Sequence, residues 1–297
     1  MTEVDSARWL EVGLPSGRTL EVVTAGPDKG TPLVFNTGSP GAAAIFAPLV
    51  AAATDHGLRT VSYSRPGYGR SSQWAGRSVA DAASDVAGLL DAIGADHFVT
   101  IGWSGGGPHA LASASLLGDR CRAAVLVSST APQGMADLDW FAGMHEANVD
   151  EYSTAQRGAE ALTPLLEKQA AGMAKMQPSD VGANLTKRAD IDPLVVASFR
   201  EFLANTLRRA VETGVGGWLD DDLAFTRPWG FDLRQIGCPV SIWHGAKDPL
   251  VPPAHASWLA ANIPCARLHV EADEGHGTLL AAAHRRIVDD LASLVGL

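Results

Sequence analysis

The sequence predicts an α/β fold: a mostly parallel central sheet flanked by helices, with an inserted helical cap. The first observation is an alternation of short β-branched runs with Ala- and Leu-rich segments, which is typical of a parallel sheet covered on both faces. The second is a long middle interval in which this alternation stops. The composition agrees, because 46% of the 297 residues are apolar and only 19% are charged, which favours a buried core over disorder.

The predicted strands are short apolar runs rich in Val, Ile, Leu and Ala. Two early runs, residues 20–25 and 33–37, are expected to form an opening antiparallel pair. The later runs are expected to be buried strands of the same sheet: residues 60–64, 98–103, 123–128, 240–245 and 266–270.

The predicted helices fill the gaps between these strands. Ser78 precedes one of them directly and is expected to be its N-cap, because a serine hydroxyl can accept a hydrogen bond from an unpaired backbone N–H of the first turn. The Ala- and Leu-rich segments expected to be helical are residues 47–56, 79–93, 106–117, 254–262 and 278–294.

The interval between Ser129 and Val240 contains no convincing strand. It holds helical or polar pieces, of which residues 155–176 and 194–213 are the clearest. We therefore expect an inserted helical subdomain rather than a second consecutive domain.

The expected organisation is one α/β core, residues 1–132 and 235–297, interrupted by a helical cap, residues 133–234. The cap carries 16 acidic and 10 basic residues, so more than half of the net charge of −10 lies in it. A solvated surface explains this acidity, and so does a negative lid that discourages anionic substrates or holds a cationic group.

The charge of the whole chain excludes some partners. A net charge of −10 argues against a general nucleic-acid or anionic-membrane binder, since both need a cationic surface. Residues 41–53, the longest mostly apolar stretch, are too few to span a bilayer, which needs about 20 residues. The N-terminus is acidic where a secretory signal would be basic, so we expect a cytoplasmic protein. The expected partner is a small-molecule substrate.

Metal and disulfide chemistry have no signal in the sequence. Cys121, Cys238 and Cys265 lie far apart along the chain, without a C-x-x-C pair. The helical histidines have no ligand spacing to another metal-binding residue. We expect no metal and no cofactor.

Residues 98–112 carry the strongest chemical signal. The pattern G-x-S-x-G, here Gly102-Trp103-Ser104-Gly105-Gly106, follows an apolar strand and opens a helix. So tight a turn needs glycine on either side of its apex and pushes the serine hydroxyl into the open. The amides that follow lie at a helix N-terminus, which favours developing negative charge. Ser104 is therefore the candidate nucleophile.

The same segment also matches a dinucleotide-binding pattern, Gly105-x-Gly107-x-x-Ala110. Such a site uses an acidic residue at the end of the next strand, about 20 positions on. Residues 127–130, where that strand ends, contain no carboxylate. We favour the nucleophile over a nucleotide site or a purely structural turn.

A serine nucleophile needs a base, and the base needs an orienting acid. Asp248 lies in a loop just after the predicted strand 240–245. His276 lies between two glycines after the next strand. The chain order of the candidates is Ser104, Asp248, His276.

This order resembles the α/β-hydrolase superfamily, in which nucleophile, acid and histidine follow in sequence at the carboxyl ends of parallel strands. Residues 37–41, Thr-Gly-Ser-Pro-Gly, are similar to the family's His-Gly-x-Pro oxyanion loop, and residues 64–71 to its Asp-x-x-Gly-x-Gly-x-Ser turn. The chain departs from the family at Thr37 and Ser64, where His and Asp are usual, and neither position supplies a triad member. The resemblance extends over nearly the whole chain.

The resemblance implies further site residues by position. The backbone N–H groups of Ser39 and Gly105 would form the oxyanion hole, and Gly38 and Trp103 would line the substrate site. A serine nucleophile argues against the haloalkane dehalogenases and epoxide hydrolases of the superfamily, which use aspartate there.

The predicted function is a serine hydrolase that cleaves a small carboxylic ester or amide through an acyl-enzyme. Three alternatives stay open. Proline iminopeptidases of the superfamily bind a free α-amine with an acidic cap, and Asp220-Asp221-Asp222 near Trp218 could serve, unless they are a solvated turn. Cofactor-free perhydrolases, haloperoxidases or lyases use the same triad. A hydrolase-like receptor would bind a ligand without turnover.

Overall fold

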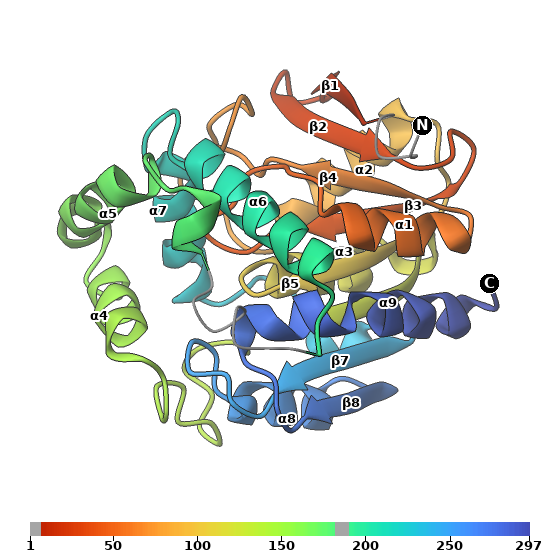
Figure 1. The fold of residues 1–297 in the computed structure, drawn as a ribbon. Coiled ribbons are helices and arrows are strands. Elements are labelled where there is room, and N and C mark those ends of the chain that lie inside the picture. The colour runs from red at the N-terminus through yellow and green to blue at the C-terminus, as the bar shows by residue number, and fades with distance from the viewer. Residues whose placement is uncertain (1–6, 182–189) are drawn as a thin grey trace.

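The computed structural model describes residues 7–181 and 190–297. Its centre is an eight-stranded sheet in which β2 is antiparallel to both of its neighbours and the other neighbouring pairs are parallel (Figure 1). In spatial order the strands are β1 Arg8–Gly13, β2 Thr19–Ala25, β4 Leu58–Tyr63, β3 Thr31–Asn36, β5 Phe98–Trp103, β6 Cys121–Val127, β7 Val240–Gly245 and β8 Ala266–Glu271. The predicted α/β class with a mostly parallel sheet is confirmed.

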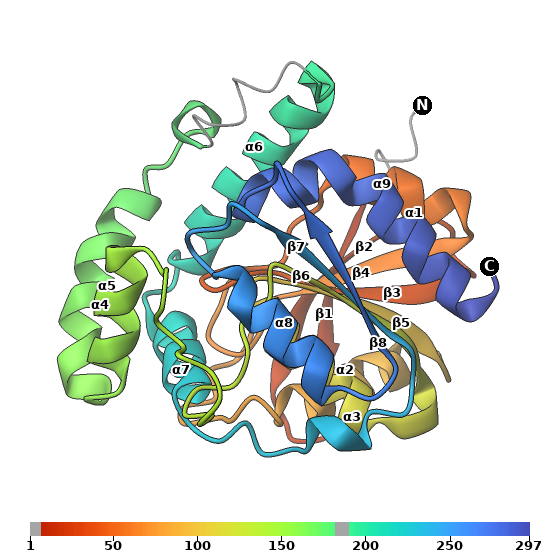
Figure 2. The ribbon, with the colours of Figure 1, turned by 90° about the horizontal axis from the view of Figure 1, so that it is seen from below.

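Helices cover both faces of the sheet, as the view from below shows (Figure 2). On one face lie α1 Ala47–Asp55 and α9 His276–Val295. On the other lie α2 Ala82–Ala92, α3 Gly106–Leu116 and α8 Pro253–Asn262.

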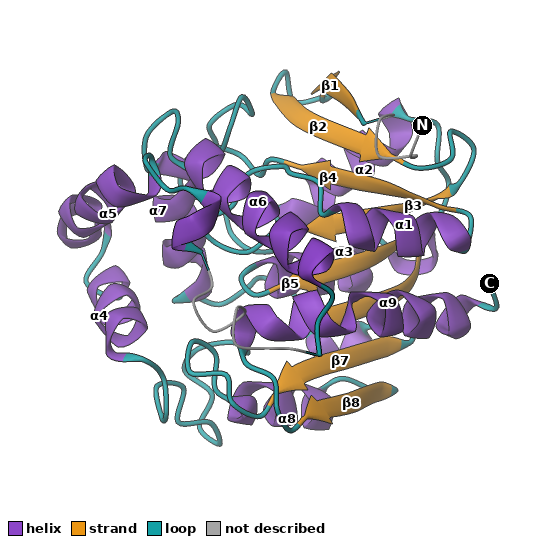
Figure 3. Ribbon diagram, in the orientation of Figure 1, coloured by secondary structure: helices purple, strands orange, loops and turns teal. Residues whose placement is uncertain are grey.

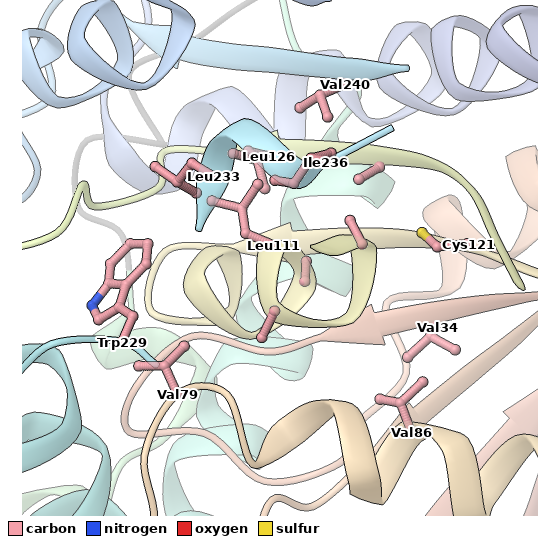
Figure 4. Packing of buried hydrophobic residues seen from close by; sticks show 14 of the residues in the cluster. Val34, Val79, Val86, Leu111, Cys121, Leu126, Trp229, Leu233, Ile236 and Val240 are labelled. Atoms are coloured by element: carbon pink, nitrogen blue, oxygen red, sulfur yellow. The ribbon is translucent and has the colours of Figure 1, made fainter. Parts of the chain in front are cut away.

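The two faces of the sheet bury separate hydrophobic clusters. Strand β6 shows the alternation: Ala124 and Leu126 belong to the cluster under α2, α3 and α8, whereas Val125 and Val127 belong to the cluster under α1 and α9. Figure 4 shows the first cluster, in which Leu111 of α3 lies among side chains from the sheet and its flanking segments. Burial on both faces explains why the central strands read as continuous apolar runs.

Between β6 and β7 the described residues form helices and loops but no strand (Figure 3). The helices are α4 Glu146–Ala155, α5 Ala159–Met173, α6 Pro193–Ala210 and α7 Gly216–Phe225. The expected helix 155–176 is divided at its start, because Gly158 adopts φ +99° between α4 and α5. The boundaries of a separate cap stay a prediction.

The predicted opening pair of strands is wrong. Strands β2 and β3 run in opposite directions, but β4 lies between them and pairs with both. Strand β3 lies in the middle of the sheet, between β4 and β5, and is buried along nearly its whole length. The partner of β2 on its other side is β1, which the sequence analysis missed. Its residues are mostly exposed, so it lacks the apolar run of a buried strand.

The predicted N-cap at Ser78 is also wrong. Helix α2 begins at Ala82, and Asp81 precedes it. The backbone N–H and the hydroxyl of Ser78 both donate to the Asp81 carboxylate, at 2.7 and 2.8 Å. The serine therefore stabilises a turn that comes before the helix.

Two findings concern the remaining sequence expectations. The three cysteines are free, although the Cys121 and Cys238 sulfur atoms lie 4.0 Å apart. Among residues 7–181 and 190–297, no helix is long and apolar enough to cross a membrane.

Substitution within α3 tests the position of the core. Leu111 is fully buried, and we expect Leu111→Ala to lower the free energy of unfolding by about 2–5 kcal/mol, because the lost methyl groups leave a cavity. Leu116→Ala, in the same helix at a side chain that is 47% exposed, is the control and should cost under about 0.5 kcal/mol. Equal losses in chemical denaturation would contradict this packing.

Candidate active site

Ser104 lies at the apex of the turn between β5 and α3, with φ +54°. A non-glycine residue rarely adopts this left-handed region. A Cβ added at Gly102 would lie 2.6 Å from the Gly106 carbonyl oxygen, and one at Gly106 would lie 2.1 Å from that of Asn36. Close packing thus requires glycine on both sides of Ser104, and the serine adopts the strained conformation that directs its side chain outward.

Ser104, His276 and Asp248 form a continuous hydrogen-bonded chain. The Ser104 Oγ is 2.9 Å from His276 Nε2, and His276 Nδ1 is 2.8 Å from Asp248 Oδ2. The other Asp248 oxygen accepts the backbone N–H groups of Leu250 and Val251, at 2.9 and 3.0 Å. The three side chains follow β5, β7 and β8, whose carboxyl ends share one edge of the parallel sheet.

The surroundings of Asp248 keep its carboxylate charged. Burial alone would raise the pKa of Asp248, but the nearby His276 and the hydrogen bonds that the carboxylate accepts bring this pKa below its ordinary value. A charged acid beside the imidazole favours the tautomer with a proton on Nδ1, which leaves Nε2 free to accept a proton from serine.

The loop after β3 packs against the serine. A Cβ added at Gly38 would lie 3.4 Å from the Ser104 Cβ and 3.6 Å from the Trp103 ring. A Cβ added at Gly105 would lie 2.9 Å from the Ser39 backbone nitrogen. The residues expected to supply the oxyanion hole, Ser39 and Gly105, are therefore in direct contact beside Ser104.

The two departures from the family pattern have local partners of their own. The Thr37 hydroxyl donates to the Gly41 carbonyl at 3.1 Å, which closes the loop 37–41. The Ser64 hydroxyl accepts the Ala43 N–H at 2.9 Å and donates to the Glu21 carboxylate at 2.8 Å. The Ser64 hydroxyl thus links the Glu21 carboxylate to the backbone at Ala43, just after this loop, although residue 64 is not itself acidic.

A cavity of about 580 Å³ opens beside Ser104. Gly38, Ser39, Trp103, Ser104 and His276 all line it. Most of its far wall is apolar and comes from the segment between β6 and β7: Tyr152, Met173, Val181, Phe199, Leu203, Leu207 and Trp218. The structure thus brings the seven candidate residues together, with Asp248 behind the imidazole and Gly105 beside Ser39.

Glu151 is a cavity residue that the sequence analysis missed. Its carboxylate accepts the Trp218 Nε1–H at 3.1 Å. Burial raises the pKa of Glu151 above its ordinary value. It lies in α4, whose sequence has no motif, so nothing in the sequence marked it.

The acidic run 220–222 is neither a solvated turn nor part of the cavity wall. All three side chains are buried in α7. Asp220 accepts Gln73 Nε2 at 2.6 Å and the Gly76 N–H at 2.9 Å. Burial, and then the nearby Glu151, raise the pKa of Asp222 well above its ordinary value, which favours the neutral acid. The apolar residues that flank the run, Trp218-Leu219 and Leu223-Ala224-Phe225, were the overlooked signal of burial.

Asp221 pairs with two buried arginines. Arg65 Nη2 and Arg77 Nη2 lie 2.7 and 2.6 Å from its two oxygens. Burial would raise the pKa of Asp221, but the two guanidinium groups hold it well below its ordinary value. The neighbouring His109 stays neutral, because burial and the charge of Arg65 lower its pKa to about 4. Sequence analysis missed Arg65, although it lies in the quoted turn 64–71.

Metal binding has no support in the described part of the chain, where no group of three or more His, Cys, Asp or Glu side chains could hold an ion.

Two proteins similar in sequence and one solved structure show what the chain resembles. The chain is 38% identical over 277 residues to a non-heme chloroperoxidase from Streptomyces lividans, with 91% of this chain and 93% of that protein covered. It is 31% identical over 195 residues to a pimeloyl-[acyl-carrier protein] methyl ester esterase from Aromatoleum aromaticum, covering 63% and 69% of the two chains. The crystal structure of a bromoperoxidase from Bacillus anthracis shares the fold with a TM-score of 0.69 at 20% identity, covering 98% and 100%.

The family described as alpha/beta hydrolase fold matches residues 31–283, a range that includes Ser104, the loop 37–41, Asp248 and His276. With the sheet order and these relatives, the match shows that this chain belongs to the alpha/beta hydrolase family.

Proposed function

We propose that the protein hydrolyses a small carboxylic ester, or the corresponding amide, through an acyl-enzyme formed on Ser104. The observation that carries this proposal is the hydrogen-bonded chain from Ser104 through His276 to Asp248 at the floor of an open cavity. A hydroxyl, a base and an orienting acid at these distances are the arrangement that nucleophilic catalysis by serine requires.

In the proposed reaction, His276 Nε2 takes the Ser104 proton as Oγ attacks the substrate carbonyl. The imidazolium then gives this proton to the leaving alcohol or amine, and the acyl group stays on Ser104. Water, deprotonated by His276, attacks the acyl carbon and releases the acid. Asp248 keeps its charge throughout and stabilises the imidazolium.

Negative charge develops on the carbonyl oxygen in both halves of the reaction. The N–H groups of Ser39 and Gly105 are proposed to stabilise it, and the contact between these residues beside Ser104 supports this assignment. The removal of one such donor typically costs about 3 kcal/mol of barrier.

The cavity supports a small, largely apolar substrate. Its volume of about 580 Å³ is within the range of small-molecule sites. The far wall consists of residues from α4 to α7, which supports the proposal that residues 133–234 act as a cap and determine specificity. Asp220–Asp222 do not line the cavity, so they give no support to an aminopeptidase.

Perhydrolysis is a second candidate function, favoured by the 38% identical chloroperoxidase relative. Hydrogen peroxide in place of water would attack the acyl-enzyme, releasing a peracid and regenerating the Ser104 hydroxyl. The peracid would then oxidise a halide in solution and return to the carboxylic acid. This chemistry needs no resident cofactor and uses the same three side chains.

The nucleophile is tested by Ser104→Ala on a panel of short-chain nitrophenyl esters. We expect kcat to fall by on the order of 10⁵-fold or more, because no other group can form the acyl-enzyme. Thermal unfolding of the variant checks that its fold is intact. Turnover equal to that of the wild type would contradict the proposed mechanism.

The role of Asp248 is tested by Asp248→Asn, which keeps the shape of the side chain and removes its charge. We expect kcat to fall by about 10³–10⁴-fold, because the imidazole loses its correct tautomer. Since the pKa of Asp248 is lowered, its carboxylate accepts a proton only as the pH falls through this lowered value. Because the wild-type carboxylate is charged at any pH above this value, the loss should be present across the neutral pH range in a pH–rate profile. A folded Asp248→Asn variant with the wild-type kcat at neutral pH would contradict this role.

The second candidate is tested by halogenation of an acceptor dye in the presence of acetate, bromide and hydrogen peroxide. If the protein is a perhydrolase, the rate depends on acetate and is lost in Ser104→Ala. A rate for the wild type no higher than that of Ser104→Ala would exclude this function.

A further inference from the structure

We propose that Arg65, held by Asp221, is a positioning residue that aims the backbone N–H of Ser39 at the oxyanion. This inference rests on the serine-hydrolase function proposed above. It concerns how the second element of the site, the loop 37–41, keeps its shape.

Arg65 binds two consecutive backbone carbonyl groups of the loop 37–41. Its guanidinium is buried, and Nη1 donates to the Thr37 carbonyl at 2.7 Å while Nη2 donates to the Gly38 carbonyl at 2.8 Å. A planar guanidinium presents its N–H donors in a fixed fork, so two carbonyls bound at once cannot rotate independently. The loop therefore has one backbone orientation where it passes Ser104.

The geometry of the peptide group carries this constraint to Ser39. The Gly38 carbonyl and the Ser39 N–H belong to one planar peptide, in which the two groups point in opposite directions when the bond is trans. Arg65 binds the carbonyl, so the N–H must point away from the arginine. Gly105 lies close to this nitrogen, because a Cβ added there would be 2.9 Å from it. The arginine thus directs the donor toward the space beside the nucleophile.

Asp221 fixes the arginine and the loop together. Its Oδ2 accepts Arg65 Nη2 and Nε, at 2.7 and 3.1 Å, and also the hydroxyls of Ser39 and Tyr68, at 2.9 and 2.8 Å. Arg77 binds the other oxygen at 2.6 Å. A buried charge with these partners is costly to displace, because any group left unpaired would be desolvated. Since Asp221 lies in α7, the orientation of the oxyanion donor depends on the segment between β6 and β7.

The test is Asp221→Asn, measured as the ratio of kcat/KM for an oxoester to kcat/KM for the matching thionoester. Sulfur is larger than oxygen and a weaker hydrogen-bond acceptor, so an aligned oxyanion hole favours the oxoester. We expect kcat for the oxoester to fall by about 10–100-fold, part of the effect of losing a donor, and the ratio to fall by about 10-fold. If the role of Asp221 were purely structural, kcat/KM would fall by the same factor for both substrates, in proportion to the folded fraction of the variant.

Two further variants keep the test decisive. Asp220→Asn is the matched control, because this neighbour is also buried in α7 but binds Gln73 and Gly76 rather than the loop. It should leave the ratio unchanged. Should Asp221→Asn fail to fold, Ser39→Ala removes a single contact with Asp221 and keeps the backbone N–H, and it should lower the ratio by about 2–5-fold.

The outcomes separate this inference from the proposed function. If Ser104 is not a nucleophile, the wild type shows no ester turnover that depends on Ser104. If the wild type is active and the folded Asp221→Asn variant keeps the wild-type ratio, the positioning role is overturned while the serine mechanism stands.

Discussion

The whole site depends on one steric constraint at the end of β5. The chain turns from strand to helix in so little space that a side chain at Gly102 or Gly106 would collide with backbone, and Ser104 is left with φ +54°. This strain is sustained because β5 lies in the middle of a sheet buried on both faces. The parallel neighbours β7 and β8 end at the same edge, so the loops that follow them bring Asp248 and His276 to the serine.

A second constraint is electrostatic and joins distant parts of the chain. Asp221 of α7 is buried between Arg65 and Arg77, and Arg65 also holds the loop that packs on Ser104. Buried polar networks are specific because each member left unpaired costs free energy. The segment that forms much of the cavity wall is therefore joined, through Asp221 and Arg65, to the loop that packs on Ser104.

The sequence predicts the central strands and the tight strand-to-helix turn at Ser104 well, because both depend on local patterns: apolar runs, glycines at fixed spacing and a helix start. It predicts the wrong partner for β2. Strand β4 lies between β2 and β3, and this pairing of segments distant in sequence is not encoded by any local pattern. The exposed strand β1 is not predicted, because its sequence has no apolar run. The acidic run 220–222 suggests solvent, yet it is buried because partners more than 100 residues away, such as Arg65 and Gln73, satisfy it. Cavity residues such as Glu151 have no signal at all.

The central claim is that Ser104 is an activated nucleophile at an open cavity. Labelling of the intact protein with a fluorophosphonate, followed by peptide mapping, tests this claim most directly, because the probe reacts preferentially with a serine hydroxyl that a base activates. We expect one adduct, on the peptide that contains Ser104, and its loss in the His276→Ala variant. An unlabelled folded protein, or an adduct on another residue, would contradict the account.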